Sequence, residues 1–137
     1  MTGSTTGSTT TDGSGNYALN AYTGDTVTVT PGKLPLLPGA SGINNVDVIA
    51  VLRHFLGVTL IPPGCRLTAA DVTGDANITV ADVVAVQRFY LGITTGTANV
   101  GKYQFSPTSR NYLNLTTNQS VENYSALIFG DVAAPSP

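Results

Sequence analysis

Charged residues are scarce in this chain of 137 residues: six are Lys or Arg, eight are Asp or Glu, and only one is Glu. They make up 10% of the chain, less than half the usual share of about 25%. Without a stripe of Lys and Arg to neutralise phosphates, we expect no binding to nucleic acid. A carboxylate pair for glycoside hydrolysis is also not expected, because Glu122 is the only Glu and the clustered Asp residues are better explained as ligands.

Cysteine, histidine and long apolar runs are equally scarce. The one cysteine, Cys65, excludes an internal disulfide, and a lone Cys beside an apolar segment is expected to be a small buried hydrophobe. The one histidine, His54, lies in no motif with a nucleophile, so we expect a surface or core-edge role and no enzymatic activity. No apolar run approaches the ~20 residues that span a bilayer, so membrane insertion is not expected.

The segment MTGSTTGSTT has neither the basic start nor the apolar centre of a secretory signal peptide. Ser and Thr, 29 residues in all, take surface positions that charged residues usually fill. This balance is typical of an exported protein, so we expect an extracellular or cell-surface location for a chain that carries no signal peptide itself. A cytosolic location is the alternative.

Alternating apolar and polar residues predict strands near both ends of the chain. In 1–33, the segments NYALNAY and DTVTVTPG indicate two strands, joined by a hairpin turn at AYTGDT. In 99–137, the segments KYQFSP, NYLNLTT and NYSALIFGDV indicate more strands, and the apolar run 126–129 predicts a strand covered on both sides. Each β part is too small for a core of its own, so we expect both to form one small antiparallel β-sandwich-like domain.

Between them, the stretch 34–98 has the period of helices. Apolar residues at i, i+3, i+4 and i+7 predict an amphipathic helix over 45–56 that ends at Gly57, and a second helix that ends at Gly92. Their apolar stripes consist of Val48, Val51, Leu52 and Phe55, and of Val83, Val86, Tyr90 and Leu91. The segment LTAAD predicts one further helical turn. The order of elements predicts an α+β fold in which 34–98 is inserted into a β domain of 1–33 and 99–137.

The helical stretch is an internal repeat. The segment INNVDVIAVLRHFLG (43–57) aligns without gaps on ITVADVVAVQRFYLG (78–92), with eight of fifteen positions identical. Such a duplication predicts a pseudo-two-fold pair of helices whose apolar stripes face each other. The segment DVTGDANITVAD (71–82), which leads into the second helix, gathers three of the eight acidic residues.

These segments resemble a type I dockerin, the two-repeat module of cellulosomal and other exported bacterial proteins, in which an EF-hand-like loop is followed by one helix. The resemblance covers 36–92 and is specific for the second repeat. It implies a loop that binds one Ca²⁺ through oxygens of its first, third, fifth, seventh, ninth and twelfth positions. In this sequence these are Asp71, Thr73, Asp75, the carbonyl of Asn77, Thr79 and Asp82.

Two positions depart from the common loop: Thr73 stands where Asn or Asp is commoner, and Ala76 replaces Gly where φ is often positive. Three carboxylates still exceed the charge of the ion, so we expect an affinity of about 10⁻⁵–10⁻³ M, which suits extracellular calcium. The alternative is a polar loop and helix cap without a metal. The first loop, LLPGASGINNVD, keeps only Asp47 of the acidic positions, so we expect it to be metal-free and held by packing.

The predicted strands resemble another module, the carboxypeptidase-regulatory-like or Cna-B-like β-sandwich repeat of bacterial surface proteins. The segments that carry this resemblance, TDGSGNYALNAYTGDTVTVTPGK and YQFSPTSRNYLNLTTNQSVENYSALIFG, usually adjoin in such repeats. The resemblance implies that the sandwich lacks its first strand or strands here, which leaves an exposed sheet edge.

Together the resemblances imply a non-enzymatic, calcium-stabilised attachment module with a cohesin-like protein partner. The dockerin positions that grip a cohesin correspond to 45–46 and 80–81, which hold Asn-Val and Val-Ala in place of the common Ser-Thr pair. The main alternative is a self-assembling filament or matrix subunit, in which one copy donates its Thr-rich N-terminus to the sheet edge of the next. A third hypothesis is an accessory module that tethers a catalytic domain.

Overall fold

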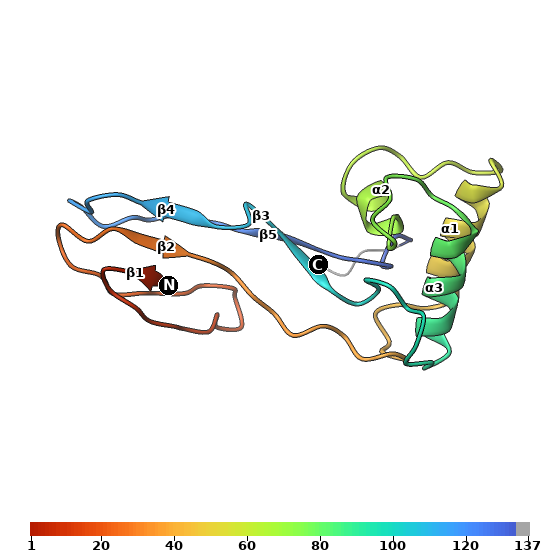
Figure 1. Ribbon diagram of the computed structural model, residues 1–137, viewed down its shortest axis with the longest axis horizontal. Helices are drawn as coiled ribbons and strands as arrows, with labels where there is room; N and C mark the ends of the chain where they lie inside the picture. Colours follow the sequence, from red (N-terminus) through yellow and green to blue (C-terminus); the bar gives the residue numbers. More distant parts are fainter. Residues whose placement is uncertain (134–137) are drawn as a thin grey trace. The chain divides into compact units, whose positions relative to one another are not determined.

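Two compact units make up the structure, a computed structural model that describes residues 1–133 (Figure 1). The β unit consists of 1–32 and 105–125, and the described part of the helical unit consists of 33–104 and 126–133. The protein is a small mixed α+β protein with two small antiparallel sheets. The units differ from the sequence-based ranges, because 99–104 and 126–133 belong to the helical unit.

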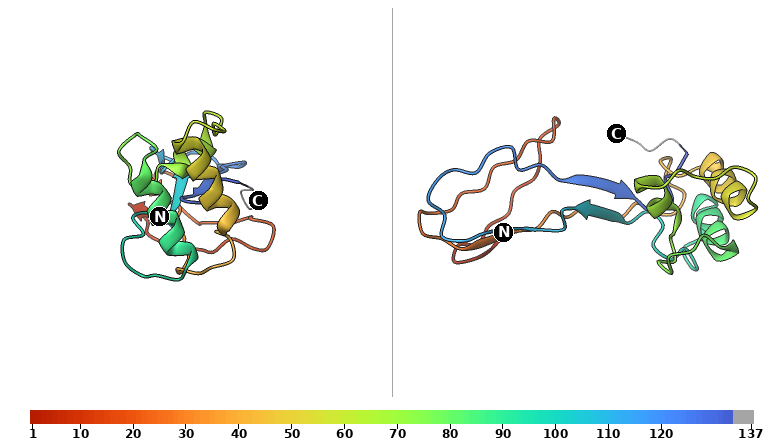
Figure 2. Two further views of the ribbon diagram at one scale, coloured as in Figure 1. Left: turned by 90° about the vertical axis from the view of Figure 1, so that its right-hand side faces the viewer. Right: turned by 90° about the horizontal axis from the view of Figure 1, so that it is seen from above.

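The helical unit contains the repeat as two packed helices, α1 (Asn45–Phe55) and α3 (Val80–Tyr90), drawn in Figures 1 and 2. The helix bounds agree with the sequence prediction to within a residue at the C-terminal end. A short helix, α2 (Cys65–Ala70), lies between them in the chain, where one helical turn was expected. In the described residues 1–133, no helix is long and apolar enough to cross a membrane.

Both long helices begin with the same capping box. Asn44 and Thr79 are the N-cap residues, and each side chain accepts the N–H of the residue two positions later. In return, the carboxylates of Asp47 and Asp82 accept the N–H groups of the two N-cap residues, at 2.9 and 2.8 Å. The capping satisfies N–H groups that would otherwise have no partner in the first turn. The duplicated sequence therefore specifies duplicated helix starts.

Both helices also end in the same way. The N–H of Gly57 donates to the carbonyl of His54 at 3.0 Å, and that of Gly92 donates to the carbonyl of Phe89 at 2.9 Å. In each case the N–H of the next residue reaches one residue further back, which completes a Schellman motif. The motif needs a left-handed residue, and φ is +68° at Gly57 and +77° at Gly92.

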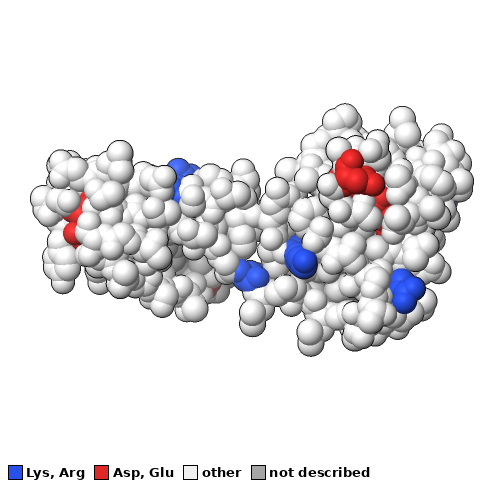
Figure 3. All heavy atoms as spheres, in the orientation of Figure 1, with Lys and Arg blue, Asp and Glu red and all other residues white. Residues whose placement is uncertain are grey.

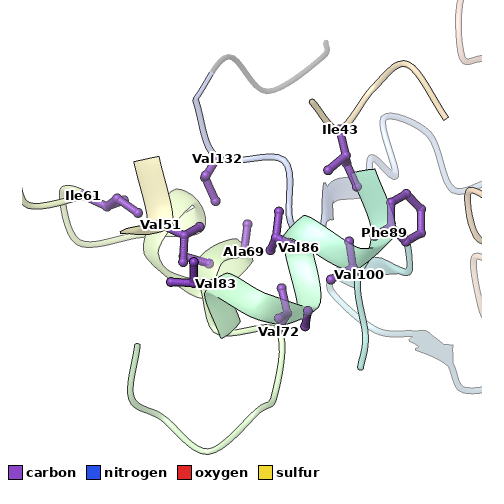
Figure 4. Close-up of a cluster of buried hydrophobic side chains, with 12 residues drawn as sticks. Ile43, Val51, Ile61, Ala69, Val72, Val83, Val86, Phe89, Val100 and Val132 are labelled. Atoms are coloured by element: carbon purple, nitrogen blue, oxygen red, sulfur yellow. The ribbon is translucent and has the colours of Figure 1, made fainter. Parts of the chain in front are cut away.

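The core of the helical unit comes from both helices, α2 and the loops around them (Figure 4). Its buried residues are Ile43, Val51, Ile61, Ala69, Ala70, Val72, Val83, Ala85, Val86, Phe89, Val100 and Val132. The predicted stripes are partly wrong, because Leu52, Phe55, Tyr90 and Leu91 are exposed. Asp82 is buried at the start of α3 and must face its loop, so Ala85, Val86 and Phe89, which follow it at helical spacing, turn inward instead.

The β unit holds a three-stranded antiparallel sheet in the order β1 (Thr2–Gly3), β2 (Val27–Val29) and β4 (Arg110–Tyr112). Val27, opposite Tyr112, is its buried hydrophobic residue. A second sheet pairs β3 (Tyr103–Ser106) with β5 (Ser125–Ile128). These strands confirm the predicted positions of strands at 27–29, 103–106 and 125–128 and shorten the one expected in NYLNLTT.

Two strand predictions are wrong. The segment 17–22 forms no strand, and the N–H of Tyr22 donates to the carboxylate of Asp25 at 2.8 Å instead. The expected hairpin is therefore a turn without a first strand, because β1 already pairs with one edge of β2 and β4 with the other. The run 126–129 is not covered on both sides, since Ala126 is exposed and the next three residues are half-buried.

Candidate metal centre

The loop from Asp71 to Asp82 connects α2 to α3. The carboxylate of Asp71 accepts hydrogen bonds from the backbone of the same loop. One carboxylate oxygen of Asp71 accepts the N–H groups of Gly74 at 2.7 Å and Asp75 at 3.2 Å. The other oxygen accepts the N–H of Ala76 at 2.8 Å. Three successive N–H groups thus point at one carboxylate, which requires positive φ at Gly74 (+78°) and at Ala76 (+66°). The sequence-based expectation of a positive φ at 76 is confirmed.

Asp82 closes the loop from its other end. One carboxylate oxygen caps α3 through the N–H of Thr79, and the other accepts both the N–H and the hydroxyl of Thr73, each at 3.0 Å. Asp82 is fully buried, whereas Asp71 is half-buried and Asp75 is exposed. A buried carboxylate requires partners for its charge, and the loop supplies four hydrogen bonds from two Thr residues.

The structure brings the three predicted carboxylates together. Ligand oxygens of Asp71, Asp75 and Asp82 all lie within 4.8 Å of one another. Oxygens bound to one Ca²⁺ at 2.3–2.6 Å can be at most about 4.6–5.2 Å apart, so this spacing fits a shared ion. No Lys or Arg forms a salt bridge with any of the three in residues 1–133, and Figure 3 shows acidic atoms gathered at one place on the helical unit. The three aspartates can hold a metal ion.

The neutral candidates take different places. The hydroxyl of Thr73 lies among the carboxylates, 3.0 Å from Asp82 and 3.4 Å from Asp71. Asn77, whose backbone carbonyl is the predicted ligand, donates its side-chain amide to the carbonyl of Asp75, at 3.0 Å, and its N–H to the Asp75 carboxylate, at 2.9 Å. The hydroxyl of Thr79 serves the helix cap, where it accepts the N–H of Ala81 at 3.2 Å.

The first repeat has a different arrangement around its one conserved carboxylate. Asp47, the counterpart of Asp82, is also buried and also caps its helix. Its second oxygen accepts the N–H groups of Val132 and Ala133, both at 2.9 Å. No pattern in the sequence indicated these partners, because they lie outside both repeats. The alignment of the two loops pointed to Asp47 itself, as the counterpart of Asp82.

The two remaining residues that the sequence analysis singled out are His54 and Cys65. The Nδ1 atom of His54 accepts the N–H of Ile61 at 2.9 Å, which ties α1 to the following loop. Cys65 is exposed, so the expectation of a buried hydrophobe is wrong. It is the first residue of the short helix α2, in the exposed stretch of chain that precedes the buried Ala69 and Ala70.

A tyrosine cluster is the other polar centre, and it belongs to the β unit. Arg110 forms a salt bridge with Glu122 at 2.9 Å and lies over the ring of Tyr124. The hydroxyl of Tyr17 donates to the carbonyl of Glu122 at 2.6 Å. Burial, together with a hydrogen bond to the Glu122 carboxylate, raises the pKa of Tyr112 to about 12. These contacts join segments far apart in the chain and indicate a structural cluster.

In comparisons with known proteins, the chain matches no protein-family model, no curated protein sequence and no solved structure.

Proposed function

We propose that the protein is a calcium-stabilised, extracellular attachment module of the dockerin-like kind, without enzymatic activity. The observation that carries the proposal is the approach of three carboxylates, from Asp71, Asp75 and Asp82, to within 4.8 Å in a loop that leads into a helix. Three like charges at this separation repel one another, and a divalent cation removes that repulsion. The charged ligand atoms of the site are carboxylate oxygens, which favour a hard cation such as Ca²⁺.

The residues of the loop would bind the ion in different ways. Asp71, Asp75 and Asp82 would supply the charged oxygens, and Thr73 is the nearest neutral donor. In the proposal, the carbonyl of Asn77 and the hydroxyl of Thr79 complete the set, as in the EF-hand pattern. A bound ion supplies no reaction chemistry here. It stabilises the loop and the start of α3, because ligand ordering and ion binding are coupled.

Attachment would use the outer faces of the two helices. Equivalent positions of the repeats are equally exposed: Ile49 and Val84 at 42%, Phe55 and Tyr90 at 43% and 41%, Leu56 and Leu91 at 60%. Such apolar exposure on both helices is typical of a protein-binding surface. The acidic residues of these helices, Asp47 and Asp82, are buried, whereas Arg53 is exposed. The matching partner is a cohesin-like protein with an apolar patch and acidic residues at its rim.

Calcium titration by calorimetry tests the ion site. The sharpest variant is Asp75→Asn, because Asp75 is exposed and the hydrogen bond it accepts from Asn77 can be kept by an amide oxygen. Asp12→Asn is the matched control, since Asp12 is an exposed Asp that accepts the N–H of Ser14 in a similar turn. We expect binding at about 10⁻⁵–10⁻³ M in the wild type, loss of at least tenfold in Asp75→Asn, and no change in Asp12→Asn. Equal binding by all three proteins would exclude this site.

The attachment surface is tested by binding to a cohesin domain in calcium. The variants Ile49→Glu and Val84→Glu place charge on the two exposed apolar positions, and Gln87→Glu is a control on an exposed polar position of α3. Each apolar variant should weaken binding at least tenfold, while the control binds as the wild type does. No binding by the calcium-loaded wild type would remove a cohesin from the possible partners.

One observation favours a second candidate, a self-assembling surface filament or matrix subunit. Strand β1 covers the edge of β2 with only two residues, Thr2 and Gly3, both exposed. The same segment of another copy can form the same antiparallel hydrogen bonds, which is strand exchange between copies. Sedimentation in calcium and then in chelator distinguishes the candidates. A monomer with a protease-sensitive N-terminus supports attachment alone, and fibres with a protected N-terminus support self-assembly.

A further inference from the structure

We infer that the segment Gly130–Ala133 is the built-in partner of Asp47 and orders the first repeat without a metal ion. We call this arrangement the C-terminal clasp: the segment Gly130–Ala133 held between Asp47 and Arg66. Its contrast with the second repeat rests on the proposed calcium site, but the clasp itself does not.

The two repeats use the same carboxylate oxygen for different partners. In both, one oxygen of the Asp at the third helical position caps the helix, at 2.9 Å from the N–H of Asn44 and 2.8 Å from that of Thr79. The other oxygen of Asp82 faces the loop with the two further carboxylates. The other oxygen of Asp47 faces two successive N–H groups, of Val132 and Ala133, both at 2.9 Å.

The N–H groups of Val132 and Ala133 carry partial positive charge, and both point at one oxygen of Asp47. They take the place that a cation would have in a loop with more carboxylates. Hydrogen bonds to an ionised group are roughly twice as strong as neutral ones. Asp47 is 1% exposed, so water cannot replace these partners. The clasp therefore supplies the charge compensation that a buried carboxylate requires.

Arg66 holds the same two residues through their carbonyls. Its Nε donates to the carbonyl of Val132 at 2.6 Å, and its Nη2 donates to that of Ala133 at 3.0 Å. The segment thus has its N–H groups on an anion and its carbonyls on a cation. The Val132 side chain is fully buried in the core beside Val51 and Val86 (Figure 4).

The start of the segment is fixed by close packing. The N–H of Gly130 donates to the carbonyl of Ala69 at 2.8 Å. A Cβ at Gly130 would lie 2.7 Å from a methyl carbon of Val100, and φ is +93°. Only glycine fits this position without strain, which brings the following residues onto α1 and α2 in a single register.

Hydrogen exchange of the full chain, measured with calcium and with chelator, tests the clasp. In the variants Asp47→Asn and Arg66→Gln, amides of α1 and of 130–133 should exchange about 10- to 100-fold faster in both solutions, because charge-assisted hydrogen bonds are lost or weakened. The matched controls are Asp12→Asn and Arg53→Gln, which change an exposed Asp and an exposed Arg and should leave α1 unchanged.

Two results would overturn the inference: wild-type rates for α1 in both variants, or loss of α1 protection in the wild type when calcium is removed. Arg66→Gln keeps the test decisive if Asp47→Asn does not fold, because the Arg66 side chain is at the surface. An α3 helix that does not respond to calcium would contradict the proposed calcium site and leave the clasp standing.

Discussion

Gly101 lies against the ring of Phe89 so closely that a Cβ at Gly101 would be 2.7 Å from two ring carbons. The same Cβ would lie 3.0 Å from the carbonyl oxygen of Leu36, and φ at Gly101 is +83°. Phe89 is 1% exposed and cannot turn away without opening the core. Gly101 is thus required both for its backbone conformation and for its lack of a side chain.

We predict that Gly101→Ala lowers the free energy of unfolding of the helical unit by about 2–5 kcal/mol, from left-handed strain and overpacking. Denaturant unfolding followed by circular dichroism measures the change. Gly57→Ala is the control, because φ is +68° there but nothing lies within 4 Å of the added Cβ, so the cost should be about 1–2 kcal/mol. Similar losses in both variants would mean that the contact with Phe89 contributes little.

Ala76→Gly should stabilise the loop, because Ala76 adopts φ of +66° while its N–H is bonded to Asp71. The left-handed conformation costs Ala about 1–2 kcal/mol, and glycine gives back about 0.4–1 kcal/mol through the freedom of the unfolded chain. The expected net gain is therefore about 0.5–1 kcal/mol in calcium-free denaturation. Ala81→Gly, in the first turn of α3, should instead be destabilising. A loss of stability in Ala76→Gly would show that strain at this position is small.

Asp82 and Asp75 should differ in their effect on the calcium-free protein. Asp82→Ala removes the cap of α3 and the bonds to Thr73, so it should cost about 2–4 kcal/mol without any ion. Asp75→Asn should change the calcium-free stability by less than about 0.5 kcal/mol, as expected for a surface position. Thermal unfolding in chelator measures both. Equal destabilisation by the two variants would contradict the separate roles assigned to them.

Calcium should raise the thermal stability of the wild type. At a concentration 100 times the dissociation constant, binding to the folded state alone adds about 2.7 kcal/mol. Asp75→Asn should lose this gain, and Asp12→Asn should keep it. Excess chelator should return the wild type to its calcium-free midpoint, and a midpoint that never depends on calcium would exclude coupling between the ion and folding.

The β unit should lose stability at high pH. Burial and the Glu122 carboxylate raise the pKa of Tyr112 from 10.0 to about 12. The folded state therefore keeps its proton where the unfolded state has lost it, so the stabilisation is complete below pH 10 and is lost as pH rises through about 12. Unfolding midpoints measured across this range should fall more steeply in the wild type than in Tyr112→Phe. Parallel slopes would exclude Tyr112 as the source.

The helix pair and its loop could be predicted because their determinants are local. The helix caps, the Schellman motifs and the hydrogen bonds to the loop carboxylates join residues at most nine positions apart. Because the segment is duplicated, the caps and the Schellman motifs occur in both repeats. Even the rotation of α3 was encoded locally, since a capping Asp82 must face the loop. The sequence analysis placed Tyr90 in the buried stripe, whereas the structure buries Phe89. The two residues satisfy the helical period after Val83 and Val86 almost equally well.

The strands were harder to predict, because alternation shows a buried face but not a pairing partner. The segment around Tyr17 and Leu19 alternates well and half-buries both side chains, yet β2 already has a neighbour on each side. The partners of Asp47 were unpredictable for a similar reason. Nothing in the spacing of Val132 and Ala133 indicates that their backbone N–H groups meet a carboxylate in the first repeat.

The long separation within the C-terminal clasp has a consequence for biosynthesis. Asp47 is joined to residues 85 and 86 positions later, whereas the carboxylates of the second loop accept hydrogen bonds from residues within 71–82. During translation, the first repeat is synthesised well before Val132 and Ala133. Contacts between residues so far apart in the chain form late and slowly. The repeat that is synthesised first is therefore the one that is completed last.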